Sequence, residues 1–237
     1  MRGVELREAH VHYGPLEALH GITLAAPAAA LTVLLGRNGS GRTTTLRALA
    51  GTLPLTRGSV VRDGRDITHR PAHARAAAGL CFIPDRQTVF ASLTVRENLE
   101  LAHPEGDFTE ALEIYPELRA LLPRRAGTLS GGEQRILALS RAPLSGAGVV
   151  LVDEPTQGMS PALAARTYEL LDALDACVVV AEQRLPPALR PGGGTGRTAL
   201  VHELRRGTVV FSGEPGEFGG TGPGPSPAGV SPSCPRE

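Results

Sequence analysis

One short stretch constrains the fold more than any other: residues 36–43 read GRNGSGRT and directly follow the apolar run LTVLL. The stretch fits the phosphate-binding loop pattern G-x-x-x-x-G-K-[ST] except at one position, where Arg42 stands in place of lysine. The apolar run is typical of a strand buried on both faces, and the spacing of TTTLRAL predicts a helix that ends before Gly51. A glycine loop between a buried strand and a helix is the context that phosphate binding requires.

The chemistry of such a loop is largely that of its backbone. Its N–H groups and the N-terminus of the following helix cradle phosphate oxygens, while Arg42 faces the β- and γ-phosphates and the Thr43 hydroxyl binds Mg²⁺. The alternative is an ordinary glycine-rich turn between a strand and a helix. The residues expected to bind a nucleotide are Gly36, Arg37, Asn38, Gly39, Ser40, Gly41, Arg42, Thr43 and Thr44.

The arginine in the loop belongs to a chain-wide replacement, because arginine supplies all 24 basic side chains and no lysine occurs. Both side chains carry a positive charge, so nucleotide binding should survive. The guanidinium is wider and points differently, so hydrolysis should be slower. Retention of the motifs described below favours an active enzyme, and a site that binds without turnover is the alternative.

Composition narrows the function classes. The chain has 237 residues, 41% of them hydrophobic, enough for one large domain or a domain with an inserted subdomain. Its net charge is zero, which argues against a nucleic-acid partner. The cysteines at 81, 177 and 234 are too far apart in sequence to suggest a disulfide framework or zinc site. Without a signal-peptide core or an apolar run of ~18 residues, the expected location is cytoplasmic.

Apolar strands alternate with helices along the chain, which predicts an α/β fold with a parallel sheet. Residues 86–142 read as a helical insert, in which Thr94 and Glu97 form a capping box. The domain is expected to span residues 1–215, and residues 216–237, rich in Gly and Pro, to form a disordered tail. Besides 31–35, the predicted strands are 4–11, 21–24, 149–152, 177–181, 198–201 and 208–211.

The second chemical motif is VVLVDEPT at residues 149–156, where a buried strand ends in two carboxylates. Ligands of open α/β sheets lie at the carboxyl ends of strands. Asp153 would assist Mg²⁺, and Glu154 would polarise the water that attacks the γ-phosphate. Alone, this motif could be a buried strand followed by acidic turn residues, but here it lies about a hundred residues after a glycine loop.

The third motif is LSGGEQR at residues 129–135. Ser130 can cap the following helix, with Glu133 returning the bond, which leaves a helix N-terminus ready for an anion. The motif resembles the signature of ATP-binding cassette (ABC) proteins. In that family it binds the γ-phosphate of ATP held by a partner subunit, which assigns this role to Ser130, Gly131, Gly132 and Glu133.

The order of loop, signature and acidic strand resembles the ABC family over about residues 4–215. Four longer segments are similar to those of the ATP-binding subunits of branched-chain amino acid importers and of urea-type importers. They are PDRQTVFASLTVRENLELA, AGTLSGGEQR, DEPTQGMSP and VVVAEQR. The resemblance implies a P-loop NTPase (RecA-like) parallel-sheet core, an N-terminal antiparallel β subdomain and an inserted helical subdomain.

The resemblance also implies roles for three further residues. Tyr13 matches the aromatic residue that stacks on adenine, although a half-buried tyrosine at a strand end is the alternative. Asp85 falls where many cassettes carry a glutamine that contacts Mg²⁺. Gln183 falls where most cassettes carry a histidine that senses the γ-phosphate, so it joins Glu154 as a catalytic candidate.

The function expected from the resemblance is an ATPase subunit on the inner face of the cell membrane that powers import of an amino acid or a similar small polar solute. Its partners would be permease subunits, contacted through the helical insert and residues 85–98, and a second ABC ATPase subunit. Val89, Phe90 and Leu93 could serve that contact or the core. The rivals are a regulatory cassette without turnover, a soluble DNA-repair or translation cassette, which normally needs a longer chain, and an exporter.

Overall fold

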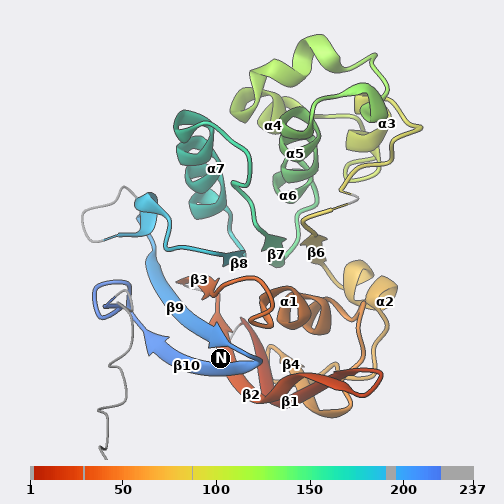
Figure 1. The fold of residues 1–237 in the computed structure, drawn as a ribbon. Helices are drawn as coiled ribbons and strands as arrows, with labels where there is room; N and C mark the ends of the chain where they lie inside the picture. The colour runs from red at the N-terminus through yellow and green to blue at the C-terminus, as the bar shows by residue number, and fades with distance from the viewer. Residues whose placement is uncertain (1–2, 29, 87, 191–195, 220–237) are drawn as a thin grey trace, which may run out of the picture.

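A six-stranded sheet forms the centre of the molecule in the computed structural model, which describes residues 3–28, 30–86, 88–190 and 196–219 (Figure 1). Five neighbouring strands are parallel, and β10 pairs antiparallel to β9 at one edge. In spatial order the strands are β10 (Thr208–Gly213), β9 (Thr198–Arg205), β3 (Ala30–Leu35), β8 (Cys177–Glu182), β7 (Val149–Asp153) and β6 (Leu80–Ile83).

A second sheet, antiparallel throughout, is built from the N-terminal part of the chain. Its order is β2 (Leu16–Pro27), β1 (Gly3–Tyr13), β4 (Arg57–Arg62) and β5 (Arg65–Asp66). Helix α1 (Arg42–Ala50) lies between the two sheets, where Leu46 and Leu49 share an apolar cluster with Leu6 and Leu151. The helix that follows the glycine loop is therefore held from both sides.

The remaining helices mostly gather on the other face of the six-stranded sheet (Figure 1). Their core includes Tyr115 and Leu137, which pack in one cluster with Val150 and Val152 of β7. The α-helices are α2 (Ala72–Ala77), α3 (Val95–Glu100), α4 (Thr109–Ile114), α5 (Gly131–Leu139), α6 (Arg141–Leu144) and α7 (Pro161–Ala173). The short 3₁₀ turns are η1 (Pro116–Leu121), η2 (Ala126–Thr128) and η3 (Pro187–Leu189).

These observations confirm the predicted fold class, with a parallel core, an antiparallel N-terminal sheet and a helical lobe. The domain limits stay a prediction. Residues 191–195, and residues 220–237 of the predicted tail, lie outside the described residues. Just before that boundary, the ring of Phe218 packs edge-on against Phe211 with centroids 5.4 Å apart. No helix in the described ranges is long and apolar enough to cross a membrane.

Local signals in the sequence explain where several elements begin and end. Thr94 caps α3, as predicted: its hydroxyl oxygen accepts from the N–H of Glu97, and its own N–H donates to the Glu97 carboxylate. Gly51 ends α1 with a φ of 75°, a left-handed conformation that glycine adopts without strain. The predicted strands 198–201 and 208–211 are present as β9 and β10, which form a hairpin whose turn places Arg206 and Gly207 at positive φ.

His202 of β9 gives the fold a dependence on pH. Its Nε2–H donates to the carbonyl of Ala25 at 3.1 Å, and its Nδ1 lies 2.8 Å from the Ser212 hydroxyl oxygen. Burial lowers the pKa of His202 below its ordinary value. The unfolded chain therefore takes up a proton, as pH falls below about 6.5, that the folded chain binds less readily.

We expect the free energy of unfolding to fall between pH 7.5 and 5.5 more steeply in the native chain than in His202→Gln. The difference is at most about 1.4 kcal/mol per pH unit, the limit for one proton. Urea unfolding at several pH values measures it, with the exposed His69 replaced by Gln as control. Equal slopes for the native chain and His202→Gln would contradict the prediction.

Candidate functional site

A cavity of about 280 Å³ lies where the glycine loop meets the carboxyl ends of the parallel strands. It brings together the glycine loop and residues from three distant segments, those after β6, β7 and β8, with β3, β7 and β8 side by side beneath them. The lining residues are Arg37, Asn38, Gly39, Ser40, Gly41, Arg42, Thr43, Thr44, Asp85, Arg86, Glu154, Gln157 and Gln183.

The loop itself, residues 36–41, depends on glycine at two positions. A Cβ on Gly36 would lie 2.4 Å from Ser40 Oγ and 2.5 Å from the carbonyl oxygen of Leu204. Gly41, the residue before α1, has a φ of 107°, and its Cβ would meet Leu19 at 2.9 Å. The first N–H groups of α1 have no acceptor within the helix, so they face the cavity as donors for an anion.

Arg42 is buried, with 5% of its side chain exposed, and its Nη2 donates to Glu154 Oε1 at 3.0 Å. Gln183 Nε2 reaches both oxygens of the same carboxylate, at 3.1 Å and 3.3 Å. Arg42 and the two candidate catalytic residues, Glu154 and Gln183, thus form one cluster. The positive charge of Arg42 balances the negative charge of the Glu154 carboxylate, the group that would activate water.

Glu154 has an unusual backbone as well as an unusual partner. Its φ is 49°, in the left-handed region, and its N–H donates to the carbonyl of Ala181 on β8 at 2.9 Å. For a residue with a Cβ this conformation costs about 1–3 kcal/mol and concentrates at functional sites. The sharp turn at the end of β7 directs the carboxylate into the cavity.

Asp153 is 1% exposed, and neither of its carboxylate oxygens has a hydrogen-bond partner among the described residues. Burial raises the pKa of Asp153 and the nearby Asp85 acts in the same direction, whereas the Thr43 hydroxyl and Arg42 oppose the shift. Unsatisfied buried oxygens beside a hydroxyl fit a hard divalent cation such as Mg²⁺, which prefers few protein ligands, water and phosphate oxygens. Asp85 lines the same cavity and also faces Arg86 Nε at 3.6 Å.

Tyr13 and the signature residues lie outside the cavity. Tyr13 is 42% exposed, and its hydroxyl lies 3.5 Å from Thr44 Oγ1 at the end of the loop. Ser130 caps α5: its N–H donates to Glu133 Oε2 at 2.7 Å, and Glu133 N–H returns a bond at 3.3 Å. The helix N-terminus at Ser130, Gly131, Gly132 and Glu133 is thus formed as predicted, but away from the loop of its own chain.

The sequence had not singled out Arg86 and Gln157, which complete the cavity wall. Gln157 lies in the turn after β7, where its N–H donates to the carbonyl of Glu154 at 3.3 Å. The closeness of Gln157 to the DEPT motif was the available signal. Arg86 follows Asp85 directly, and its side chain is 90% exposed.

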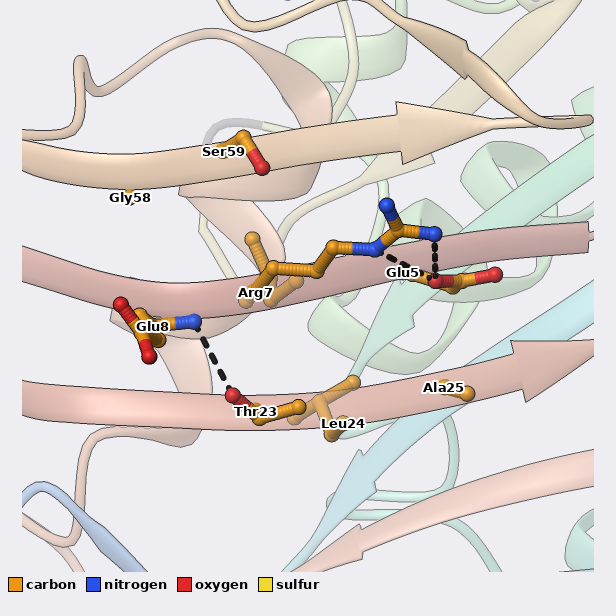
Figure 2. Close-up of a pocket in the computed structure, with 9 residues that line it drawn as sticks. Glu5, Arg7, Glu8, Thr23, Leu24, Ala25, Gly58 and Ser59 are labelled. Atoms are coloured by element: carbon orange, nitrogen blue, oxygen red, sulfur yellow. Dashed lines mark hydrogen bonds and ion pairs between the residues drawn. The ribbon is translucent and has the colours of Figure 1, made fainter.

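A different hollow, of about 500 Å³, lies on the antiparallel sheet (Figure 2). There Arg7 donates from Nε and Nη2 to Glu5 Oε2, and Glu8 N–H donates to Thr23 Oγ1 at 3.0 Å. It contains none of the loop, strand-end or signature residues. The cavity at the glycine loop, which holds the predicted phosphate-binding and catalytic residues, is therefore the candidate functional site.

The sequence of the chain is similar to those of known proteins over most of its length. The family model described as "ABC transporter" matches residues 19–157. The chain is 35% identical over 217 residues to the probable branched-chain amino acid transport ATP-binding protein LivF of Archaeoglobus fulgidus, covering 87% of this chain and 89% of that protein. It is 32% identical to the high-affinity branched-chain amino acid transport ATP-binding protein BraG of Pseudomonas aeruginosa, covering 76% and 81%.

Solved structures show the same fold at lower identity. A nucleotide-free ATP-binding cassette from an ABC transporter superimposes with a TM-score of 0.77 at 21% identity, covering 90% of this chain and 92% of that one. An ATP-binding subunit of an ABC transporter gives a TM-score of 0.78 at 20% identity, covering 90% of each. The resemblance drawn from the motifs is confirmed. The chain belongs to the ABC transporter family and carries its ATP-binding cassette.

Proposed function

We propose that this cassette hydrolyses ATP to power a membrane importer of branched-chain amino acids or similar small polar solutes. The observation that carries the proposal is the position of Glu154, whose carboxylate enters the phosphate cavity one residue after the buried Asp153. The names of the relatives from Archaeoglobus fulgidus and Pseudomonas aeruginosa support the choice of solute.

Each group in the cavity has a distinct part in this chemistry. The amides of the loop and the Arg42 guanidinium would bind the phosphates of ATP. Thr43, Asp153 and Asp85 would hold Mg²⁺, which when bound neutralises charge on the β- and γ-phosphate oxygens. Glu154 would orient the attacking water and accept its proton, and Gln183, already bonded to that carboxylate, would keep it aimed at the γ-phosphate.

The proposal includes a second cassette as partner. The capped N-terminus of α5 is exposed and lies outside its own phosphate cavity, so it is free to meet the ATP of a neighbouring subunit. Two chains arranged head to tail would then complete two sites. A sister ATPase could replace the second copy.

The permease subunits would dock on the helical lobe, at the cytoplasmic face of the membrane. Of the apolar residues in segment 85–98, Val89 is partly buried against the core and Leu93 is half-buried, whereas Phe90 is 53% exposed. The buried Asn98 holds the Phe90 backbone through both its N–H and its carbonyl, at 2.8 Å and 3.1 Å. Phe90 is therefore the residue of this segment that a permease would contact.

A second function has one specific observation in its favour. Arg42, the proposed phosphate-binding cation, and Glu154, the proposed catalytic base, form an ion pair with each other. A cassette in which ATP failed to break this pair would bind nucleotide and dimerise without turnover. Such a chain would regulate a sister subunit.

The test is steady-state ATP hydrolysis by the native chain and by Arg42→Lys. We expect measurable turnover in the native chain and an increase of up to about a hundredfold in Arg42→Lys, the effect of correcting a misplacement near 1 Å. Fluorescent-nucleotide titration of both proteins measures binding separately. A native chain that binds ATP without turnover, with activity appearing in Arg42→Lys, would favour the regulatory function; a native chain that binds no ATP would contradict both.

A further inference from the structure

Arg135, the last residue of LSGGEQR, ties the signature helix to the sheet. It lies on the second turn of α5, and its side chain is 6% exposed. Its Nη1 donates to the carbonyl of Pro84 at 2.6 Å, and its Nη2 donates to the carbonyl of Asp153. Pro84 follows β6 and Asp153 ends β7, which are neighbouring parallel strands (Figure 1). One side chain thus joins a helix to the carboxyl ends of two strands.

Packing alone does not account for a buried cation at this place. No carboxylate of the described ranges lies within ion-pair distance of Arg135, and its Nε has no hydrogen-bond partner there. Burying an unpaired cation is costly, and an apolar side chain would fill the space at lower cost. Burial lowers the pKa of Arg135, while the charges of Asp153 and Asp85 oppose that shift. The cation thus lies near two of the three predicted Mg²⁺ ligands, Asp153 and Asp85.

The peptide units that Arg135 holds belong to the site itself. Pro84 immediately precedes Asp85, and Asp153 immediately precedes Glu154, and both Asp85 and Glu154 line the phosphate cavity. A shift of the backbone at Asp85 and Asp153 on binding of a metal and a nucleotide would also shift the two carbonyls that accept from Arg135. The rigid, planar guanidinium passes that movement to α5, whereas a flexible single donor would not.

We propose that Arg135 is the positioning residue that couples metal–nucleotide binding at Asp85 and Asp153 to the orientation of α5. The helix carries the exposed signature residues Ser130 to Glu133, so the coupling would present the signature to a partner when its own site is loaded. Coupling of this kind is reciprocal: a partner that fixes α5 would in turn strengthen binding of the metal and nucleotide. The inference rests on the proposed nucleotide site but not on hydrolysis.

The experiment is amide hydrogen exchange of residues 131–139, with Mg²⁺–ATP and with ATP in EDTA, at concentrations where sedimentation shows a monomer. In the native chain we expect Mg²⁺–ATP, but not metal-free ATP, to slow exchange about fivefold or more, the lower range of measured couplings. In Arg135→Gln, binding of metal-free ATP should stay within about threefold of native while the response of α5 is lost.

Arg141→Gln is the matched control. Arg141 also donates from the helical lobe to a carbonyl of the segment after β6, that of Thr88 at 3.3 Å, but it does not reach β7. We expect Arg141→Gln to keep the native response. Arg135→Lys retains the positive charge but not the planar pair of guanidinium donors. Relative to Arg135→Gln, it should therefore restore stability more than it restores the coupling.

The outcomes separate the two proposals. A native chain that binds no ATP would contradict the proposed nucleotide site itself. Native binding with an unchanged α5 response in Arg135→Gln, or equal loss in Arg141→Gln, would overturn the coupling role alone. If neither Arg135→Gln nor Arg135→Lys folds, Arg135 is a structural anchor and the coupling role is wrong.

Discussion

Replacing Glu154 with glutamine is expected to lower ATP turnover by about 10²–10⁴-fold, the usual contribution of a positioned general base. Glutamine keeps the size of the side chain, and its carbonyl oxygen can still accept from Arg42 and Gln183, the native partners of the carboxylate. The variant loses only the ability to take a proton from water. Its affinity for ATP should be equal or higher, because a negative charge beside the phosphates has been removed.

Single-turnover hydrolysis and fluorescent-nucleotide binding measure the two quantities separately. Glu203→Gln is the matched control, because this carboxylate lies on β9 near the same edge of the sheet but pairs with Arg205 at 2.9 Å. It should leave turnover within about threefold of native, as for a substitution outside the site. Turnover in Glu154→Gln that is as fast as in the control would place the base elsewhere.

The parts of the site that the sequence predicted are those whose chemistry is local. Gly36 and Gly41 stand where a Cβ would collide with neighbouring atoms, and Ser130 with Glu133 forms a capping box within four consecutive residues. Such features depend on short-range geometry, which a pattern of residue types reproduces. Both could be read without knowing which strands are neighbours.

The contacts across the site could not be read in this way. Arg42 and Glu154 are 112 residues apart, and they meet because the strand order places β8 between β3 and β7. The bond from Gln183 to Glu154 likewise requires β7 and β8 to be parallel neighbours, with Asp153 opposite Ala181. The ion pair between Arg42 and Glu154 is therefore a consequence of the topology.

Arginines that join separate elements were also hidden from the sequence, because no spacing marks them. The buried Arg135 donates to the carbonyls of Pro84 and Asp153, and the half-buried Arg197 donates to carbonyls of Leu174, Ala176 and Ala28. In each case one guanidinium satisfies acceptors from separate elements, which its planar fork allows. An arginine can lie at the surface or donate to backbone carbonyls inside the fold. Which of the two occurs depends on which carbonyls the fold leaves without other donors.

Arg75 of α2 is the internal arginine for which we expect the largest effect on stability. It is 3% exposed and donates to the carbonyls of Ala48 and Leu49 at 2.9 Å and 2.7 Å, in the last turn of α1, where Ala48 also accepts from the N–H of Gly51 at 3.2 Å. It also donates to the carbonyls of Thr68 and Arg70, both at 2.9 Å. The helix that presents the glycine loop at its N-terminus is thus fastened at its C-terminus by one side chain.

We expect Arg75→Met to lower the free energy of unfolding by about 2–4 kcal/mol. Methionine fills the volume of the stem but removes the guanidinium donors from four carbonyls, of which those of Ala48 and Leu49 belong to buried residues, while relief of the buried charge offsets part of that cost. Urea unfolding measures the change, and Arg47→Met on the exposed face of α1 should stay within about 0.5 kcal/mol of native. A loss below 1 kcal/mol in Arg75→Met would mean that water replaces the guanidinium, and that packing between the two sheets alone holds α1 and its loop in place.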